Sequence, residues 1–195
     1  MRLALTIFIC LSCSIANAKS ILVVGDSISA GYGVELEDGW VNLLRQKVKD
    51  QYEVINASVS GDTTQIGVAR LPTLLEEHKP DIVILELGGN DGLRGFPLNV
   101  MERNLKKMTT DSLANGAKVL LVGIQIPPNY GQRYTQEFFN TYPKIAEEFD
   151  VPLVPFILEK VALEPELMQD DGIHPKTEAQ VILLDTVWPY LEPLL

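Results

Sequence analysis

The sequence predicts an α/β protein, a three-layer α/β/α sandwich around a five-stranded parallel sheet. Short apolar runs alternate with longer amphipathic stretches, which is the pattern of repeated strand–helix–strand units. The apolar runs are almost continuous in Val, Ile and Leu, as expected for strands that helices cover on both faces. No internal repeat or low-complexity linker divides the 195 residues, so one domain is expected.

Strand and helix patterns alternate along the chain. The predicted strands are Ile21–Val24, Tyr52–Asn56, Asp81–Leu87, Ala117–Ile124 and Pro152–Pro155. The predicted helices are Gly39–Val48, Asp62–His78, Leu98–Asn115, Thr135–Phe149 and a last helix that opens at Thr177. In such sheets the ligand site lies beyond the carboxyl ends of the strands, so the loops that follow the strands are the segments to inspect.

Two helix starts have the spacing of a capping box, in which a capping residue is followed three positions later by Glu or Gln. Asp62 with Gln65, and Thr177 with Gln180, fit this spacing, so we expect side-chain caps at both helices. Pro72 is expected to kink or divide the helix in which it lies. The last helix is expected to bury an apolar stripe made of Val181, Leu184 and Val187 or Trp188.

The first 18 residues predict a cleaved signal peptide. A mainly apolar stretch, Leu3–Ile15, is followed by small residues, Ala16 and Ala18, at the two cleavage-site positions. We expect cleavage before Lys19, which leaves a single domain over residues 19–195 and a periplasmic or secreted protein. The apolar stretch is shorter than the ~20 residues that span a bilayer. Both cysteines lie in the leader, so the mature chain is expected to use no thiolate chemistry.

The chain is strongly acidic. Its formal net charge is −10, and removal of Arg2 with the leader leaves 15 Lys and Arg against 26 Asp and Glu, a net charge of −11. Such a surface repels nucleic acid and anionic bilayers, and no basic tract offsets it. We therefore expect no nucleic-acid partner, no stable membrane insertion, and a small molecule as the partner.

Four polar, glycine-bearing segments are placed to converge on one edge of the sheet. Three of them, Gly25–Gly33, Ala57–Asp62 and Leu87–Gly92, follow the first three predicted strands, and the fourth, Asp170–Pro175, leads into the last helix. Because the carboxyl ends of parallel strands meet at one edge, these segments predict one shared site.

The two histidines have different contexts. His78 ends an amphipathic helix, where a solvated residue that favours the helix C-terminus is the better interpretation. His174 lies in a loop three residues after Asp171, and a carboxylate at this spacing can hold the imidazole in one tautomer while the other nitrogen removes a proton. Ser27, on a tight glycine-flanked turn after the first strand, is the best-placed nucleophile for that base.

Acyl transfer also needs hydrogen-bond donors aimed at the oxyanion that develops. The candidates are the backbone N–H groups of Ser27 and Gly61 and the side-chain amide of Asn90. Glycine at position 61 permits close backbone approach, because it has no Cβ. Leu93 and Phe96, in a glycine-flanked run directly after Asn90, are candidate substrate-binding residues that would form a wall for an acyl chain.

These residues carry a family resemblance. The blocks Gly25-Asp26-Ser27, Gly61, Gly89-Asn90-Asp91 and Asp171-x-x-His174 resemble, in order and rough spacing, those of the SGNH (GDSL) hydrolase superfamily. The sequence is most similar to the bacterial multifunctional thioesterase I/protease I/lysophospholipase group. The resemblance covers the whole mature chain, with no departure at a catalytic position.

The resemblance implies a flavodoxin-like SGNH hydrolase fold, with Ser27 as nucleophile, His174 as base and Asp171 as its orienting carboxylate. It also implies an oxyanion hole formed by Ser27, Gly61 and Asn90. The implied activities are hydrolysis of aryl esters, acyl thioesters and lysophospholipids through an acyl-Ser27 intermediate, by a monomer with no cofactor.

Other chemistries fit less well. The glycines of Gly25–Gly33 lack the spacing of a dinucleotide loop, and no His pair or HExxH motif predicts a metal. We expect Asp26 to tie its own loop to nearby backbone groups, and Glu86, in an apolar strand, to have a structural hydrogen-bonding or ion-pair role. Two alternatives stay open: a carbohydrate acetylesterase on the same fold, and a non-catalytic lipid-binding module.

Overall fold

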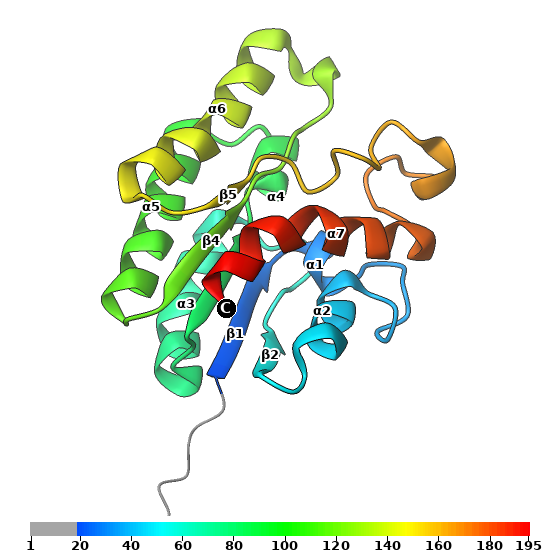
Figure 1. Ribbon diagram of the computed structural model, residues 1–195. Helices are drawn as coiled ribbons and strands as arrows, with labels where there is room; N and C mark the ends of the chain where they lie inside the picture. The colour runs from blue at the N-terminus through cyan, green and yellow to red at the C-terminus, as the bar shows by residue number, and fades with distance from the viewer. Residues whose placement is uncertain (1–18) are drawn as a thin grey trace, which may run out of the picture.

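The computed structural model describes residues 19–195, and the predicted leader, residues 1–18, lies outside the described residues. The predicted fold class is confirmed, because five parallel strands form one sheet between two layers of helices (Figure 1). The strands are β1 (Lys19–Gly25), β2 (Tyr52–Asn56), β3 (Ile82–Glu86), β4 (Lys118–Val122) and β5 (Leu153–Val154).

The seven α-helices of the described chain are distributed over both faces of the sheet. They are α1 (Ser27–Ala30), α2 (Trp40–Val48), α3 (Thr64–His78), α4 (Gly89–Leu93), α5 (Leu98–Ala114), α6 (Gln132–Phe149) and α7 (Gln180–Leu191). Four short 3-10 helices complete the described chain: η1 (Pro128–Tyr130), η2 (Pro165–Leu167), η3 (Thr177–Ala179) and η4 (Glu192–Leu194).

The two faces of β1 show why both layers are needed. Side chains alternate across a strand, so Ile21 and Val23 pack with α2 and α7 on one face, while Leu22 and Val24 pack with α3, α5 and α6 on the other. All four side chains are fully buried. The apolar run in the sequence therefore reflects a strand with a hydrophobic core on each side.

The strand order is β2-β1-β3-β4-β5, and every neighbouring pair is parallel. The chain runs from β1 outward to β2 and then returns to the other side of β1 for β3. The loops after β1 and β3 consequently diverge, and a crevice forms at the carboxyl ends of these two strands.

Neither predicted capping box forms. The carboxylate of Asp62 pairs with Arg70, and the first N–H of α3, that of Thr64, is capped by the Asp91 Oδ2 atom at 2.8 Å. The Gln180 Oε1 atom accepts a hydrogen bond from the Trp40 N–H at 3.0 Å, so it too serves a distant segment. Other partners, one in the same helix and one in a distant segment, bind the polar atoms that the local pattern assigned to caps.

The predictions for Pro72 and for the last helix need correction in part, since a division at Pro72 and burial of Val181 are contradicted. Helix α3 continues through Pro72 without being divided. Val181, predicted to be buried, is 52% exposed, whereas Leu184 and Val187 are buried as expected. Helix α7 packs against α2, and just beyond it the carbonyl of Leu195 accepts a hydrogen bond from the Tyr52 hydroxyl at 2.6 Å.

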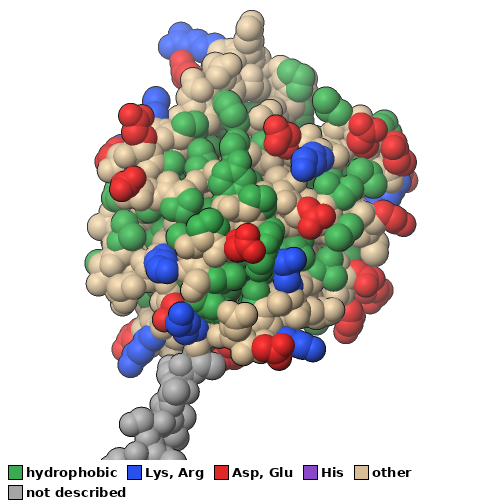
Figure 2. Space-filling view, in the orientation of Figure 1, with side chains coloured by type: hydrophobic (Ala, Val, Ile, Leu, Met, Phe, Trp, Pro, Cys, Tyr) green, Lys and Arg blue, Asp and Glu red, His purple; other side chains and the backbone are tan. Residues whose placement is uncertain are grey.

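The surface matches the acidic composition. On the face seen in Figure 2, Lys and Arg side chains are scattered singly among Asp and Glu, and hydrophobic side chains gather in the central part. Within residues 19–195, none of the helices combines the length and the apolar character that crossing a membrane requires.

Candidate active site

The first turn of α1 presents Ser27 directly beyond the end of β1. Asp26 caps this helix, because its Oδ1 atom accepts the Ile28 N–H at 3.1 Å. Gly25 leaves no room for a side chain, since an added Cβ would lie 2.6 Å from the Glu86 Oε2 atom and 2.7 Å from the Ser29 Cβ. The tight turn that exposes Ser27 thus depends on the missing Cβ at position 25.

Ser27, His174 and Asp171 form one hydrogen-bonded chain. The Ser27 Oγ atom lies 2.8 Å from His174 Nε2, and His174 Nδ1 lies 2.7 Å from Asp171 Oδ2. The other oxygen of Asp171 accepts the N–H groups of Ile173 at 2.9 Å and His174 at 3.0 Å. The structure therefore brings together, in the predicted order, the three side chains proposed from sequence.

The pKa of the Asp171 carboxyl is lowered to about 2. Partial burial acts to raise this pKa, but the hydrogen bonds from the His174 side chain and from the backbone N–H groups of His174 and Ile173 outweigh it. The carboxylate therefore stays ionised at neutral pH. An ionised acceptor at Nδ1 favours the tautomer that leaves the Nε2 lone pair facing Ser27.

The three candidate oxyanion donors differ in whether they already donate a hydrogen bond. The N–H groups of Ser27 and Gly61 find no acceptor within residues 19–195, and Gly61 adopts φ +86°, which favours glycine. The amide of Asn90 is engaged, because its Nδ2 atom donates to the Asp26 Oδ2 atom at 3.2 Å and to the Asp62 carbonyl at 3.1 Å. Asn90 must exchange one of these partners to bind an oxyanion.

Two buried carboxyls lie behind the nucleophile. Burial raises the pKa of Asp26 to about 6, against the lowering effects of the Ile28 N–H, the His174 charge and the Asn90 amide. Burial and the nearby Asp26 charge hold the pKa of Glu86 well above its usual range. Glu86 Oε2 accepts the Ser29 hydroxyl at 2.6 Å and the Asp26 N–H at 3.3 Å, which fits the predicted structural roles.

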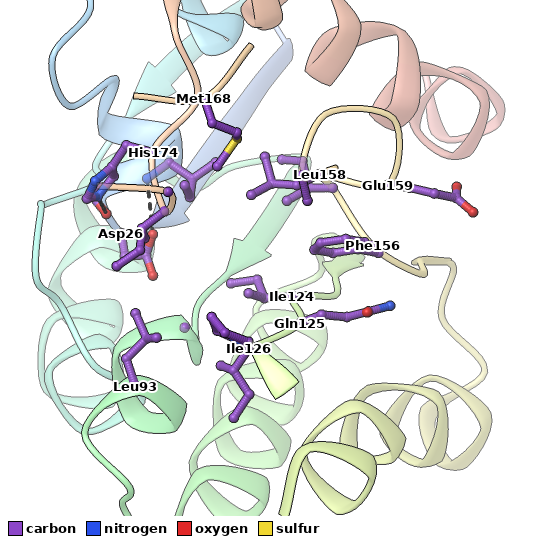
Figure 3. A pocket seen from close by; sticks show the side chains of 18 of the residues that line it. Asp26, Leu93, Ile124, Gln125, Ile126, Phe156, Leu158, Glu159, Met168 and His174 are labelled. Carbon is purple, nitrogen blue, oxygen red and sulfur yellow. Dashed lines mark hydrogen bonds between the residues drawn. The ribbon is translucent and has the colours of Figure 1, made fainter. Parts of the chain in front are cut away.

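A cavity of about 670 Å³ opens beside Ser27 and His174 (Figure 3). Its walls are largely apolar and come from the segments Ile124–Pro128 and Phe156–Leu163, with Leu93 and Met168. In Figure 3 the polar ends of Gln125 and Glu159, which belong to these walls, are turned away from the centre of the cavity. The size and lining suit an apolar chain attached to a group that reacts at Ser27.

The two predicted wall residues are placed differently. Leu93 lines the cavity. Phe96 is not among the lining residues; it is 40% exposed, and its carbonyl accepts a hydrogen bond from the Tyr134 hydroxyl at 3.0 Å. Gly61 also lies outside the cavity lining, and its carbonyl accepts a hydrogen bond from Arg94 Nη2 at 3.0 Å.

Sequence reasoning missed most of the cavity wall. The segments Ile124–Pro128 and Phe156–Leu163 follow β4 and β5 at the same sheet edge as the reactive loops. The topological rule that selected the other loops would have found them. Their residues are mainly apolar, and apolar residues are common in any core and do not by themselves indicate chemistry.

The described residues also limit what else the site holds. Among residues 19–195, no group of three or more His, Asp or Glu side chains is arranged to hold a metal ion. A serine, a base, an orienting carboxylate and two unpaired backbone donors are together the components of acyl transfer.

Comparison with known proteins agrees with this geometry. Residues 23–182 match the model of the GDSL-like lipase/acylhydrolase family. The chain is 52% identical to esterase TesA of Pseudomonas aeruginosa, over 92% of this chain and 91% of that one. It is 50% identical to thioesterase 1/protease 1/lysophospholipase L1 of Escherichia coli K12, over 92% and 86% of the two chains. The crystal structure of the esterase EstA from Pseudoalteromonas sp., inhibited by monoethylphosphonate, superposes with a TM-score of 0.86 at 40% identity, covering 90% of this chain and 97% of that one.

Proposed function

The chain belongs to the GDSL-like lipase/acylhydrolase family and is an ester hydrolase, and from this premise we propose that it transfers apolar acyl groups from esters and thioesters to Ser27 and then to water. The observation that carries the proposal is the hydrogen-bonded chain from Ser27 through His174 to Asp171, which lies at the mouth of an apolar cavity.

The reaction begins when Ser27 Oγ attacks the acyl carbonyl carbon and His174 Nε2 takes the hydroxyl proton. The N–H groups of Ser27 and Gly61 donate to the carbonyl oxygen as it becomes negative, and Asn90 joins them by releasing Asp26 or Asp62. The tetrahedral intermediate then collapses, the bond to the leaving oxygen or sulfur breaks, and His174 protonates the leaving group. Water, deprotonated by His174, releases the acid in the second step and restores the Ser27 hydroxyl.

The cavity supports acyl chains longer than acetyl as substrates. Its apolar walls gain contact with each added methylene, at roughly 0.8 kcal/mol for each CH₂ that is fully buried. An acetyl group would leave most of the 670 Å³ unfilled. We therefore favour aryl esters, acyl thioesters and lysophospholipids over the sugar acetates that a carbohydrate esterase removes, and the acidic chain favours leaving groups that are not strongly anionic.

The two histidines provide a matched test of the base. In wild-type protein a fluorophosphonate probe should label Ser27, and p-nitrophenyl octanoate should be cleaved with a higher kcat/KM than the acetate. His174→Ala should lose both labelling and turnover, whereas His78→Ala, at the far end of α3, should keep both. Labelling that persists in Ser27→Ala would exclude this serine, and a preference for acetate would favour the carbohydrate esterase.

We also propose that residues 1–18 are removed and that residues 19–195 act as a monomeric single domain in the periplasm or outside the cell. In support, the segment Leu3–Ile15 is mainly apolar, and the small residues Ala16 and Ala18 stand at the two cleavage-site positions. N-terminal sequencing should find Lys19 first in the exported protein, and retention of Met1 on an internal product would contradict export.

A further inference from the structure

The base must be held in place by a loop that has little packing of its own. Residues 170–173 are all exposed, and His174 is 147 positions away from Ser27 along the chain. Within residues 19–195 the loop pairs with no strand of the sheet, and a bridge between Met168 and Pro175 joins its two ends only to each other. Something outside the three reacting side chains must therefore set the distance between His174 and Ser27.

Gln169 contacts both the loop that carries His174 and the segment that follows Ser27. Its Nε2 atom donates to the carbonyl of Tyr32 at 2.8 Å, across 137 positions of sequence, and to the carbonyl of Pro175 at 3.1 Å. Its backbone N–H donates to the carbonyl of His174 at 2.8 Å. One residue thus holds the loop that carries the base and, at the same time, the segment that follows the nucleophile turn.

These bonds close a ring through the site. The Tyr32 N–H donates to the Ser27 carbonyl at 3.0 Å, Gln169 joins Tyr32 to His174, and His174 Nε2 returns to Ser27 Oγ. The ring of Tyr32 also packs on the imidazole, with centroids 4.5 Å apart and an interplanar angle of 39°. Loss of the Gln169 link would open the ring at a contact that spans 137 positions of sequence.

Gly33 is shaped around this glutamine. It adopts φ +73°, and an added Cβ would lie 2.6 Å from Gln169 Oε1 and 2.7 Å from Nε2. Contacts this close require the amide to move. The absence of a side chain at Gly33 therefore leaves the space that the Gln169 amide occupies when it binds the two carbonyls.

We propose that Gln169 is a positioning residue of the acyl-transfer reaction, which clamps the His174 loop to the nucleophile turn and so fixes the alignment of Nε2 with the Ser27 hydroxyl. The proposal rests on the proposed function of the site. Gln169 touches neither reacting atom. Its side chain acts by donating hydrogen bonds to backbone carbonyls, which can bind only a group that carries a donor. A side chain of the same shape that lacks the N–H donors cannot replace it.

Gln169→Glu tests this requirement, because it keeps the shape and replaces the amide donors with a carboxylate that faces two carbonyls. Misplacement of a reacting group by about 1 Å costs on the order of 10²-fold in rate, so kcat for p-nitrophenyl octanoate should fall by roughly 10- to 100-fold. KM should change by less than about threefold, because Gln169 is not among the residues that line the acyl cavity. Gln169→Ala should behave in the same way.

Gln180 supplies the matched control. It also joins distant segments through its amide, to Trp40 N–H at 3.0 Å and the Lys176 carbonyl at 3.3 Å, but it has no contact with the ring of bonds described above. Gln180→Ala should lower Tm and leave kcat per folded molecule near the wild-type value. If the Gln169 variants follow the same pattern, with kcat reduced only in proportion to the unfolded fraction, Gln169 is a structural residue and the proposal is wrong.

A pair of glycines tests the geometry from the opposite side. Gly33→Ala should reproduce the loss of kcat by displacing the Gln169 amide. Gly116→Ala imposes a similar backbone strain, at φ +84°, where an added Cβ meets nothing within 4 Å, so it should affect stability alone. Equal kcat in the two variants would overturn the clamp.

A measurement that does not depend on turnover, the ¹⁵N NMR spectrum of His174, tests the positioning role of Gln169 independently of the proposed acyl transfer. In wild-type protein the imidazole nitrogens of His174 should give ¹⁵N resonances typical of one hydrogen-bonded tautomer. In Gln169→Glu they should shift towards those of a solvent-exposed histidine. An inactive wild-type protein with these same shifts would refute the acyl transfer and retain the clamp, whereas unchanged His174 resonances in Gln169→Glu would refute the clamp itself.

Discussion

The nucleophile and its base are held in place by different means. Ser27 follows a strand that is buried from Ser20 to Gly25, on a turn anchored by the buried carboxyls of Asp26 and Glu86. His174 follows an exposed loop that is tied down by hydrogen bonds of Asp171 and Gln169. The nucleophile is therefore placed by the folding of the core, and the base by a few polar contacts at the surface. Substitutions around the nucleophile turn should therefore lower stability, and substitutions around the loop that carries His174 should lower the rate.

The two sides also respond to pH in opposite directions. Burial raises the pKa values of Asp26 and Glu86, so the folded state binds their protons more tightly than the unfolded chain does. Hydrogen bonds lower the pKa of Asp171 to about 2, so its contribution to stability is present above about pH 4 and is lost as the pH falls towards 2. Substitutions on each side can test this contrast.

The largest effect is expected on the base side, from Asp171→Asn. The amide cannot hold the imidazole as an ionised carboxylate does, and the corresponding change in a serine protease lowers kcat by ~10⁴, which we take as the upper bound. Because the Asp171 side chain is 40% exposed, Tm should change little. Kinetics and thermal unfolding on one preparation check this. A large fall in Tm with near-normal kcat per folded molecule would contradict the division between the two sides.

An intermediate effect is expected from Asn90→Ala, where the two sides meet. If the Asn90 amide leaves Asp26 or Asp62 to bind the oxyanion, its loss should lower kcat by ~10²–10³, about 3–4 kcal/mol, with a much smaller change in KM. Asn104→Ala is the control, because Asn104 is buried and donates to Thr64 Oγ1 at 3.1 Å, away from Ser27. It should lower Tm and spare kcat. Equal kcat values in the two variants would remove Asn90 from the oxyanion hole.

The smallest effect on rate is expected on the nucleophile side, from Glu86→Gln. The stabilisation that comes from the raised pKa values of Glu86 and Asp26 is complete below about pH 4 and is lost as the pH rises through their folded-state values, near pH 6 for Asp26. With a neutral residue at position 86, the decrease in Tm between pH 4 and pH 8 should be smaller than in the wild type by roughly 2–8 °C. The kcat should stay within about tenfold of the wild-type value.

Thermal unfolding across this pH range checks the expected change. A large-to-small substitution of a buried residue in the same strand, Val83→Ala, should lower Tm by a similar amount at every pH. A pH dependence in Glu86→Gln that matches the wild type would show that Glu86 does not titrate with the fold.

How much of the molecule the sequence predicted depends on the range of the interaction. All five strands were predicted, and in β1, β3 and β4 burial on both faces produces an almost continuous apolar run. Only Leu153–Val154 of Pro152–Pro155 forms β5. The capping pattern at Asp62 failed because Arg70 binds this carboxylate. The predicted burial of Val181 was wrong, because the apolar stripe of a helix indicates which face is buried but does not define the edges of that face.

The candidate site was predictable in its reactive part, since serine, histidine and carboxylate at strand ends are few and chemically specific. Its cavity was not. Ile126 and Leu158 look like core residues in the sequence, and only the fold shows that they face an opening. Phe96, chosen because it lies close to Asn90 in sequence, turns out to lie outside that opening. Gln169 carried no local signal, because each of its side-chain partners is a backbone carbonyl and one lies 137 positions away.

The separation of Ser27 and His174 along the chain has a consequence for synthesis. A ribosome delivers the nucleophile turn early, while the base, helix α7 and the Leu195 carbonyl that receives the Tyr52 hydroxyl are delivered last. Contacts of such long range form late, after the ends of the chain have met. A nascent or truncated chain therefore carries a serine without its proton acceptor, and we expect it to be inactive in acyl transfer until the loop that carries His174 has reached Ser27.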